Sequence, residues 1–301
     1  MSYSKKADTS SFEFDVFLDG KMKDDFKPKI QTFFERIEVY LPFLKEFKFK
    51  IETENTFPHS SGIASSASGM SALALCLMSN EKQMLPDISQ KSFNKKASFL
   101  ARLGSGSACR SIEGDLIVWG ENKTVEGSSD LFGVQYPYKV HENFKEYQDT
   151  ILLVDKGEKQ VSSSVGHNLM HNHPFAKNRF QQAHDNLENL KPILESGDLG
   201  GFISLIESEA LTLHAMMMTS MPYFILMKPN TLEIINKIWK FRQETNSNIS
   251  FTLDAGANFH VLYPTNKATE IFEFIKSEIF AYCQHVHYIC DQIGFGANHI
   301  K

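Results

Sequence analysis

The stretch from Phe57 to Gly69, FPHSSGIASSASG, constrains the fold most, because it runs directly into an apolar segment that ends at Met78. Serine hydroxyls and glycine-permitted turns just before a helix place hydrogen-bond donors and the positive end of the helix dipole in one small volume. A following segment that is apolar on nearly every side predicts a buried helix that holds the loop rigidly. The stretch therefore predicts a phosphate-binding loop, while serine at a helix start also serves as a simple N-cap.

No standard phosphate-loop signature accompanies this stretch. The chain contains neither the Walker A spacing Gly-x-x-x-x-Gly-Lys-Ser/Thr nor the Rossmann spacing Gly-x-Gly-x-x-Gly. The loop alone leaves phosphate binding and helix capping open, so a second signal is needed.

Length and charge exclude several classes of protein. A chain of 301 residues predicts two domains, because one hydrophobic core seldom fills so long a chain. With 36 acidic and 31 basic residues the net charge is -5, which argues against nucleic acid as a partner. The longest apolar run, around Leu73 to Met78, is too short to cross a membrane. The cysteines show no Cys-x-x-Cys spacing, which favours reduced thiols and a cytoplasmic protein; they are Cys76, Cys109, Cys283 and Cys290.

Hydrophobic periodicity predicts secondary structure along the whole chain. The expected strands are 12–18, 47–54, 116–119, 151–154, 249–253, 259–263 and 285–290, and the expected helices are 30–41, 70–78, 93–103, 180–193, 202–217, 232–239 and 268–282. We place the domain boundary between residues 148 and 149, where a charged, irregular segment precedes a new strand. The pattern predicts an α+β fold, with the helices of the second half on one side of a small antiparallel sheet.

Two charged residues are candidates for chemistry. Arg110 lies in a glycine-loosened loop, where a guanidinium can bind a carboxylate or phosphate through two parallel hydrogen bonds. Asp254 ends a strand and precedes the turn Ala255-Gly256-Ala257-Asn258, which pins its carboxylate beside a tight turn. Taken singly, Arg110 is better explained by a surface salt bridge and Asp254 by a turn cap.

The histidines do not form a convincing metal site. His167, His171 and His173 are close in sequence, but their spacing is loose and no cysteine or suitable carboxylate accompanies them. We therefore expect no metal ligands of this type and interpret them as loop or surface histidines. His285 and His287 are expected on one face of the last strand.

Three segments taken together resemble a known family. They are the loop Pro58 to Ala67 that opens a helix, the string Ala101-Arg102-Leu103-Gly104-Ser105-Gly106-Ser107-Ala108-Cys109-Arg110-Ser111, and Thr252-Leu253-Asp254-Ala255-Gly256-Ala257-Asn258. In this order they resemble the diphosphomevalonate decarboxylase family of the GHMP kinase superfamily, from about Phe12 to the C-terminus. The resemblance implies a two-domain GHMP kinase-like fold. Its parts are an N-terminal ATP-binding domain like ribosomal protein S5 domain 2 (residues 1–148) and a ferredoxin-like C-terminal domain (residues 149–301).

The resemblance also implies an activity and its cofactors. Members of the family decarboxylate mevalonate 5-diphosphate to isopentenyl diphosphate, with ATP and magnesium (Mg2+) as cofactors. ATP first phosphorylates the tertiary 3-hydroxyl, and the loss of phosphate then releases carbon dioxide. This chemistry depends mainly on positioning and charge neutralisation.

Residue roles follow from the matching positions. Asp254 is expected beside the 3-hydroxyl and Arg110 on the substrate carboxylate, as the catalytic pair. The other expected substrate-binding residues are Ser105, Ser107 and Ser163. The expected ATP-binding residues are Ser60, Ser61, Gly62, Ala64, Ser65 and Ser66. We expect Arg110 and Asp254 to meet across a cleft, and we expect a homodimer.

The chain departs from the family pattern in two places. Family members ordinarily begin with a strand of the type Ala-Pro-x-Asn-Ile-Ala-x-x-Lys-Tyr-Trp-Gly-Lys, which does not occur in this sequence. We therefore expect an amino-terminally truncated form or a misassigned start. Gly256-Ala257-Asn258 stands where Gly-Pro-Asn is usual, which removes a rigid ring but no functional side chain.

Three alternatives remain open beside the decarboxylase hypothesis. One is a small-molecule kinase that stops after phosphorylating a mevalonate-like alcohol, and another is a decarboxylase specific for the monophosphate. The third is a non-catalytic homologue that binds nucleotide or a partner chain.

Overall fold

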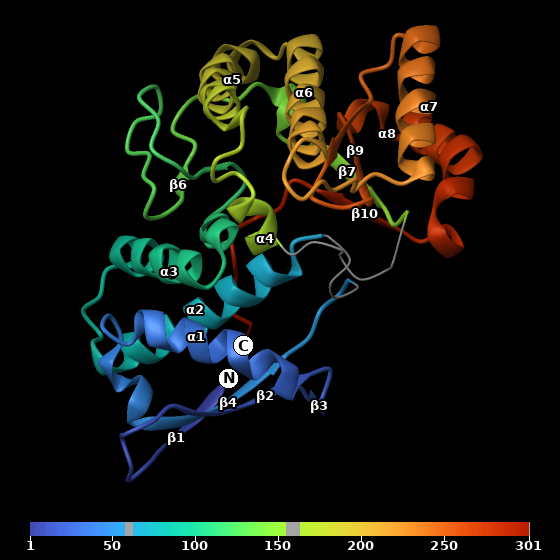
Figure 1. Cartoon of the computed structure of the whole chain (residues 1–301). Helices are drawn as coiled ribbons and strands as arrows, with labels where there is room; N and C mark the ends of the chain where they lie inside the picture. The colour runs from blue at the N-terminus through green and yellow to red at the C-terminus, as the bar shows by residue number, and fades with distance from the viewer. Residues whose placement is uncertain (58–62, 155–162, 301) are drawn as a thin grey trace. The chain divides into compact units, whose positions relative to one another are not determined.

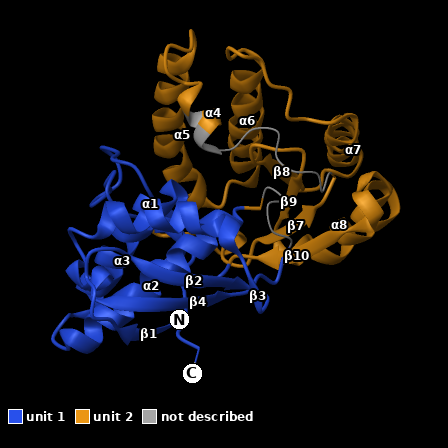
Figure 2. Ribbon diagram, turned by 60° about the horizontal axis from the view of Figure 1, so that its bottom comes forward, with its two compact units in different colours: residues 1–59, 64–136, 294–301 blue, residues 60–63, 137–293 orange. Residues whose placement is uncertain are grey.

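The structure is a computed structural model that describes residues 1–57, 63–154 and 163–300. The chain divides into two compact units, which Figure 2 shows in different colours. Unit 1 comprises residues 1–59, 64–136 and 294–301, and unit 2 comprises residues 60–63 and 137–293. Each unit has its own sheet and its own hydrophobic core.

A four-stranded sheet in the order β1-β4-β2-β3 forms one layer of unit 1. β2 and β4 run parallel, whereas β1 pairs antiparallel with β4 and β3 pairs antiparallel with β2. A separate short sheet pairs β5 with β6. The bounds are β1 Ser2–Lys5, β2 Glu13–Leu18, β3 Lys21–Met22, β4 Phe47–Thr53, β5 Ile117–Val118 and β6 Val134–Gln135.

Strict alternation of side chains explains this sheet. In β4 the lysines at 48 and 50 are exposed, whereas Phe49 and Ile51 are buried, as a strand with one solvated face requires. Asp19 and Gly20 both have positive φ, of 51° and 74°, which suits the two-residue turn that joins β2 to β3.

Three α-helices lie on the same side of the sheet (Figure 1). α1 turns one apolar stripe inward and buries Ile30, Phe33, Phe34 and Ile37. α2 is apolar on most sides and packs against α3, so it lies in the core of the unit. The bounds are α1 Lys27–Ile37, α2 Ser65–Met84 and α3 Gln90–Gly104, with short helical turns at η1 Asp24–Phe26, η2 Pro42–Lys45 and η3 Gly106–Ser111.

Unit 2 contains an antiparallel sheet in the order β10-β7-β9-β8. Its bounds are β7 Gln148–Leu152, β8 Ser250–Leu253, β9 Phe259–Tyr263 and β10 Tyr288–Gln292. One face of this sheet supplies Phe251, Phe259 and Val261 to the core, where they meet the helix residues Ile235 and Ile271.

The helices of unit 2 cover that apolar face. α6 lies along β8, and α5 lies beside α6, to which Arg179 binds through an ion pair with Glu209. The bounds are α4 Ser163–Asn168, α5 Ala176–Ser196, α6 Leu199–Met218, α7 Pro229–Thr245 and α8 Ala268–Phe274. Shorter helical turns are η4 Glu142–Phe144, η5 Thr265–Lys267, η6 Ile275–Ile279, η7 Phe280–Tyr282 and η8 Gln284–Val286.

Most predicted elements are present, and β3, β6 and α4 are additional to them. β1 was not expected, because its sequence carries one large ring, that of Tyr3, which packs edge-on against Phe47 at 5.1 Å. The helix expected over 268–282 continues from α8 into a π-helical segment and a 3-10 turn. The last strand starts at Tyr288, because His285 takes a left-handed φ of 54°, so the prediction that His285 and His287 share a strand face is wrong.

The two units divide at a different residue from the predicted domain boundary. The chain leaves unit 1 after residue 136 and returns to it at residue 294, whereas the sequence predicts the boundary at 148. The segment after 136 joins unit 2, where the His141 N–H donates to the Leu194 carbonyl at 2.7 Å. The domain division 1–148 and 149–301 stays a prediction.

Helix length and polarity give one finding about membranes. Within the described part of the chain, every helix is too short or too polar to span a lipid bilayer.

We predict that Glu207→Ala destabilises unit 2 strongly. Glu207 of α6 accepts two hydrogen bonds from Arg242 of α7, at 2.7 and 2.9 Å, and one from Trp239 at 3.0 Å. Its side chain is 10% exposed, so its removal leaves a largely buried guanidinium without its carboxylate. The expected loss in the free energy of unfolding is about 3 kcal/mol, measured by urea denaturation.

Glu278→Ala is the matched control. Glu278 of η6 pairs at 2.8 Å with Lys237 of α7, the helix that also carries Arg242. The Glu278 side chain is 53% exposed, so solvent screens the interaction. Equal losses in the two variants would contradict the assignment of Glu207 as a structural anchor.

Candidate active site

Two serine-rich segments meet in unit 1. α2 begins at Ser65, and η3 follows α3 through Ser105. The hydroxyl oxygens of Ser66 and Ser105 lie 3.1 Å apart, within hydrogen-bond distance. The predicted ATP loop and the predicted substrate loop therefore share one surface lined by hydroxyl groups.

The start of α2 offers backbone donors. Ala64 takes a left-handed φ of 57°, and its carbonyl accepts from the N–H groups of Ala67 and Ser68. Among residues 1–57, 63–154 and 163–300, the N–H groups of Ser65 and Ser66 have no hydrogen-bond partner. These two donors and the Ser66 hydroxyl are suited to bind a phosphate oxygen.

Not every serine of this helix faces a ligand. The Ser68 hydroxyl donates to the Ser65 carbonyl at 3.0 Å, and the Ser71 hydroxyl donates to the Ser68 carbonyl at 2.8 Å. Such bonds return the hydroxyls to the helix backbone. Of the described residues in the predicted ATP loop, Ala64, Ser65 and Ser66 therefore keep polar groups available.

Several predicted site residues fall outside the part of the chain that the structure describes. Ser60, Ser61 and Gly62 lie outside the described residues, and the side chain of Ser163 at the start of α4 does as well. Their roles stay predictions.

The backbone around Arg110 is held firmly. The carbonyl of Cys109 accepts from the Ser98 hydroxyl of α3 at 2.9 Å, and that hydroxyl accepts from the Gly133 N–H at 3.0 Å. Burial raises the pKa of the Cys109 thiol to about 11, so the thiol stays neutral and donates to the Gly106 carbonyl at 3.2 Å. The side chains that hold this backbone, those of Ser98 and Cys109, are thus buried.

The Arg110 side chain is exposed, in contrast to its backbone. In the described parts of the chain no carboxylate lies within ion-pair distance of its guanidinium. A fixed backbone with an uncommitted guanidinium is the arrangement expected of an anion-binding residue.

Ser107 lies in the same turn as Arg110. It is half-buried, and its hydroxyl makes no hydrogen bond to any described residue. Gly106, beside it, lies under the Trp119 ring, which is 2.8 Å from where a Cβ would be. Glycine at 106 thus lets the ring pack directly on the turn that carries Ser105, Ser107 and Arg110.

Asp254 lies in unit 2, directly after β8, with its side chain exposed. His214 of α6 donates its Nε2–H to the Asp254 carbonyl at 3.2 Å, and Thr231 of α7 donates to the Ala257 carbonyl at 3.2 Å. Both anchoring side chains are buried, at 1% and 0% exposure. Side chains of α6 and α7 therefore hold the backbone of this loop, and the Asp254 carboxylate stays exposed.

The electrostatic setting of Asp254 includes a residue that the sequence reasoning missed. His260 of β9 pairs across the sheet with Thr252, two residues before Asp254. Its Nδ1 lies 2.8 Å from an Asp149 carboxylate oxygen. Burial alone would lower the pKa of His260, but the ion pair with Asp149, helped by Asp254 and Asp291, raises it above its ordinary value.

His173, one of the three histidines that are close in sequence, has a packing role. The His173 ring lies 3.1 Å from the Met216 carbonyl and 3.2 Å from the Thr219 hydroxyl, so it ties the start of α5 to the end of α6. Within residues 1–57, 63–154 and 163–300, no group of three His, Cys, Asp or Glu side chains could hold a metal ion.

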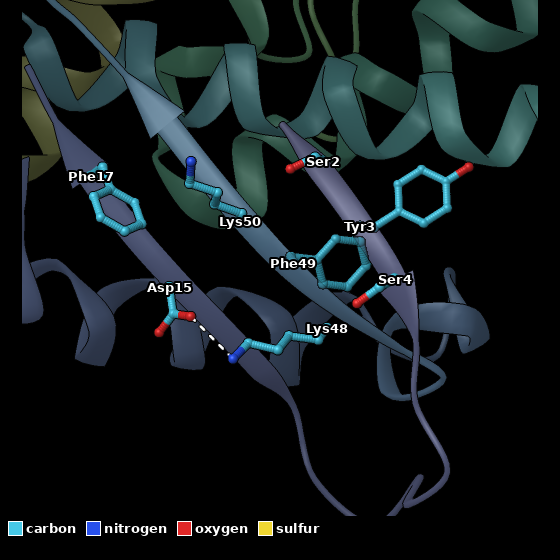
Figure 3. Close-up of a pocket in the computed structure, with 8 residues that line it drawn as sticks. All are labelled: Ser2, Tyr3, Ser4, Asp15, Phe17, Lys48, Phe49 and Lys50. Carbon is cyan, nitrogen blue, oxygen red and sulfur yellow. Dashed lines mark ion pairs between the residues drawn. The ribbon is translucent and has the colours of Figure 1, made fainter. Parts of the chain in front are cut away.

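A hollow of about 330 Å³ lies on the strands of unit 1 (Figure 3). In it Lys48 pairs with Asp15 at 3.2 Å, and the Lys50 ammonium lies 5.2 Å from the centre of the Phe17 ring. The residues that line it are Ser2, Tyr3, Ser4, Asp15, Phe17, Lys48, Phe49 and Lys50, and none of them is a predicted site residue.

Family comparisons match both halves of the chain. Residues 3–130 match the diphosphomevalonate decarboxylase-like N-terminal domain, and residues 150–294 match the mevalonate 5-diphosphate decarboxylase C-terminal domain. Diphosphomevalonate decarboxylase from Saccharomyces cerevisiae is 29% identical over 248 residues, which are 80% of this chain and 59% of the yeast protein. This chain thus spans less than two thirds of that relative's length.

Solved structures share the fold. The mevalonate diphosphate decarboxylase from Legionella pneumophila superposes with a TM-score of 0.76 at 23% identity, covering 95% of this chain and 86% of that one. A structure described as MDDEF in complex with MVAPP, AMPPCP and magnesium superposes with a TM-score of 0.78 at 25% identity, covering 96% of this chain and 83% of that one. The predicted two-domain α+β fold is confirmed, and it is that of the GHMP superfamily.

Within that superfamily the domain matches are specific. The chain belongs to the diphosphomevalonate decarboxylase family.

We predict that His214 makes folding less favourable in acid. Burial lowers the pKa of His214 below its ordinary value, against the opposing hydrogen bond to the Asp254 carbonyl. The folded state therefore binds a proton less readily than the unfolded chain, and stability is lost as the pH falls below about 6.5. His214→Gln should narrow the difference in unfolding free energy between pH 7.5 and pH 5.

His260→Gln should have the opposite effect, because a raised pKa stabilises the fold at low pH and that contribution is lost as the pH rises. The exposed His184 gives a neutral control as His184→Gln. Parallel pH curves for all three variants would show that neither buried histidine has the assigned environment.

Proposed function

We propose that this chain catalyses the ATP-dependent decarboxylation of mevalonate 5-diphosphate to isopentenyl diphosphate, with ADP, phosphate and carbon dioxide as the other products. The carrying observation is the contact between the Ser66 and Ser105 hydroxyls, because it joins the two loops that this reaction needs. The nucleotide analogue and the MVAPP named for the solved complex support the same assignment.

ATP is proposed to bind at the start of α2. The Ser65 and Ser66 N–H groups and the Ser66 hydroxyl are the donors that the described residues offer to its phosphates. Ser60, Ser61, Gly62 and the backbone at Ala64 are proposed to complete this site. Magnesium, when bound, would neutralise charge on the transferred phosphoryl group.

Mevalonate 5-diphosphate is proposed to bind beside Ser105 and Ser107, with its carboxylate on Arg110. The guanidinium is exposed and free of carboxylate partners in the described chain, so it can form two parallel hydrogen bonds to the substrate carboxylate. Ser163 is proposed to contact the diphosphate.

Asp254 is proposed to orient the 3-hydroxyl and to accept its proton as the oxygen attacks the γ-phosphate of ATP. When the new phosphate group leaves C3, the electrons of the bond between C1 and C2 form the double bond of isopentenyl diphosphate, and C1 departs as carbon dioxide. Arg110 would hold that carboxylate in line until the bond breaks. A loop fixed by His214 and Thr231 suits a carboxylate with such a positional role.

The proposal extends to assembly and location. We propose a homodimer and a cytoplasmic location, and the cysteines, which are unpaired and show no Cys-x-x-Cys spacing, support the latter.

Asp254→Asn tests the reaction directly. The amide keeps the shape of the side chain but cannot accept the hydroxyl proton, so we expect the rate of carbon dioxide release to fall by at least about a hundredfold. Carbon dioxide and phosphate are measured together with mevalonate 5-diphosphate, ATP and magnesium, and the unmodified chain should release them in equal amounts.

Asp291→Asn is the matched control, because Asp291 is an exposed carboxylate on β10 of the same sheet. It should keep full activity. ADP formation without carbon dioxide in the unmodified chain would indicate a small-molecule kinase instead, and nucleotide binding without turnover would indicate a non-catalytic homologue.

Arg110→Lys separates charge from geometry. Lysine keeps the positive charge but loses the planar pair of donors, so we expect kcat for decarboxylation to fall about tenfold or more while KM for ATP stays near its original value. An equal change in KM for ATP and for mevalonate 5-diphosphate would contradict a specific role at the substrate carboxylate.

A further inference from the structure

The segment after β10 packs on the turn that carries Arg110. Residues 294–300 belong to unit 1, although β10 itself belongs to unit 2. The Ala297 N–H donates to the Ile112 carbonyl at 3.2 Å, two residues after Arg110. Ile112 is buried in the core of unit 1. This contact therefore attaches the segment to an internal part of the chain.

Gly296 makes this contact possible because it has no side chain. A Cβ at this position would lie 2.9 Å from three backbone atoms, which belong to Ile112, Glu113 and Gly114. Backbone atoms of a packed turn cannot move aside as the end of a flexible side chain can. Its φ lies outside the left-handed region, so close approach rather than conformation requires glycine here.

Arg110 thus lies between two backbone anchors. Before it, the Cys109 carbonyl is bound by Ser98, which is 1% exposed. After it, the Ile112 carbonyl is bound by Ala297. Because no described carboxylate holds the guanidinium itself, the backbone sets where this side chain starts.

We propose that Gly296 is a positioning residue for Arg110. Its missing side chain lets residues 294–297 close on residues 112–114 and thereby fixes the backbone that presents the guanidinium to the substrate carboxylate. This inference rests on the proposed role of Arg110 in decarboxylation.

Gly296→Ala and Gly294→Ala form a matched pair. A Cβ at Gly294 would meet nothing within 4 Å, so the second variant adds the same methyl group to the same segment without a clash. We expect Gly296→Ala to lower kcat for decarboxylation about tenfold or more, since small displacements of a positioning group are costly. Gly294→Ala should keep the original rate.

A double-mutant cycle distinguishes positioning from a general loss of structure. If Gly296 acts through Arg110, Gly296→Ala should have little further effect on kcat in an Arg110→Lys background. Multiplied losses in the double variant, or an unchanged kcat in Gly296→Ala, would overturn the proposal.

Hydrogen exchange tests the contact independently of activity. Peptides covering residues 106–114 should exchange faster in Gly296→Ala than in Gly294→Ala, and equal exchange would overturn the proposal. Ala297→Pro removes the donor to Ile112 without adding a group at 296, and it gives the same test if Gly296→Ala does not fold. If the unmodified chain were inactive while the amides of residues 106–114 exchanged slowly, the proposed function would be refuted. The anchoring of this turn would still stand.

Discussion

The hydroxyl contact between Ser66 and Ser105 is the interaction on which the proposed site in unit 1 depends, because it joins two segments that are far apart in sequence. It exists because α2 is a core helix, with Ala74, Leu77 and Met78 fully buried, and because α3 packs along it. A helix buried on most sides cannot rotate or slide, so its first turn has a fixed place. Because α3 packs against α2, the turn that follows α3 is placed beside this first turn of α2.

Asp254 is held by a different principle. Its backbone is fixed by His214, whose pKa is lowered by burial, whereas the nearby His260 has a raised pKa because of its ion pair with Asp149. His214 therefore contributes a directional hydrogen bond to the Asp254 carbonyl, and His260 binds the Asp149 carboxylate. Two residues of one type thus act differently, because one binds a backbone carbonyl and the other pairs with a carboxylate.

The local parts of this site could be predicted from the sequence. The apolar run predicted a buried helix over residues 70–78, although α2 already begins at Ser65, and the glycine-rich string placed Arg110 just after a helix. Asp254 was placed correctly at the end of a strand, because alternation and the following turn residues define that end locally.

Contacts set by strand pairing could not be predicted in this way. His260 and Asp149 are 111 residues apart, and only the register of β7 against β9 brings them together. The docking of residues 294–297 on the Arg110 turn depends on the absence of a side chain at Gly296, which no periodicity reveals. β1 carries too little apolar surface to be recognised alone, and its pairing with β4 defines it.

The proposed reaction requires Arg110 and Asp254 to act on one substrate molecule. A crystal structure with mevalonate 5-diphosphate and a non-hydrolysable ATP analogue tests this most directly. We expect the Arg110 guanidinium to bind the substrate carboxylate while the Asp254 carboxylate contacts the 3-hydroxyl of the same molecule. A complex in which either group faces solvent, with the substrate held elsewhere, would contradict it.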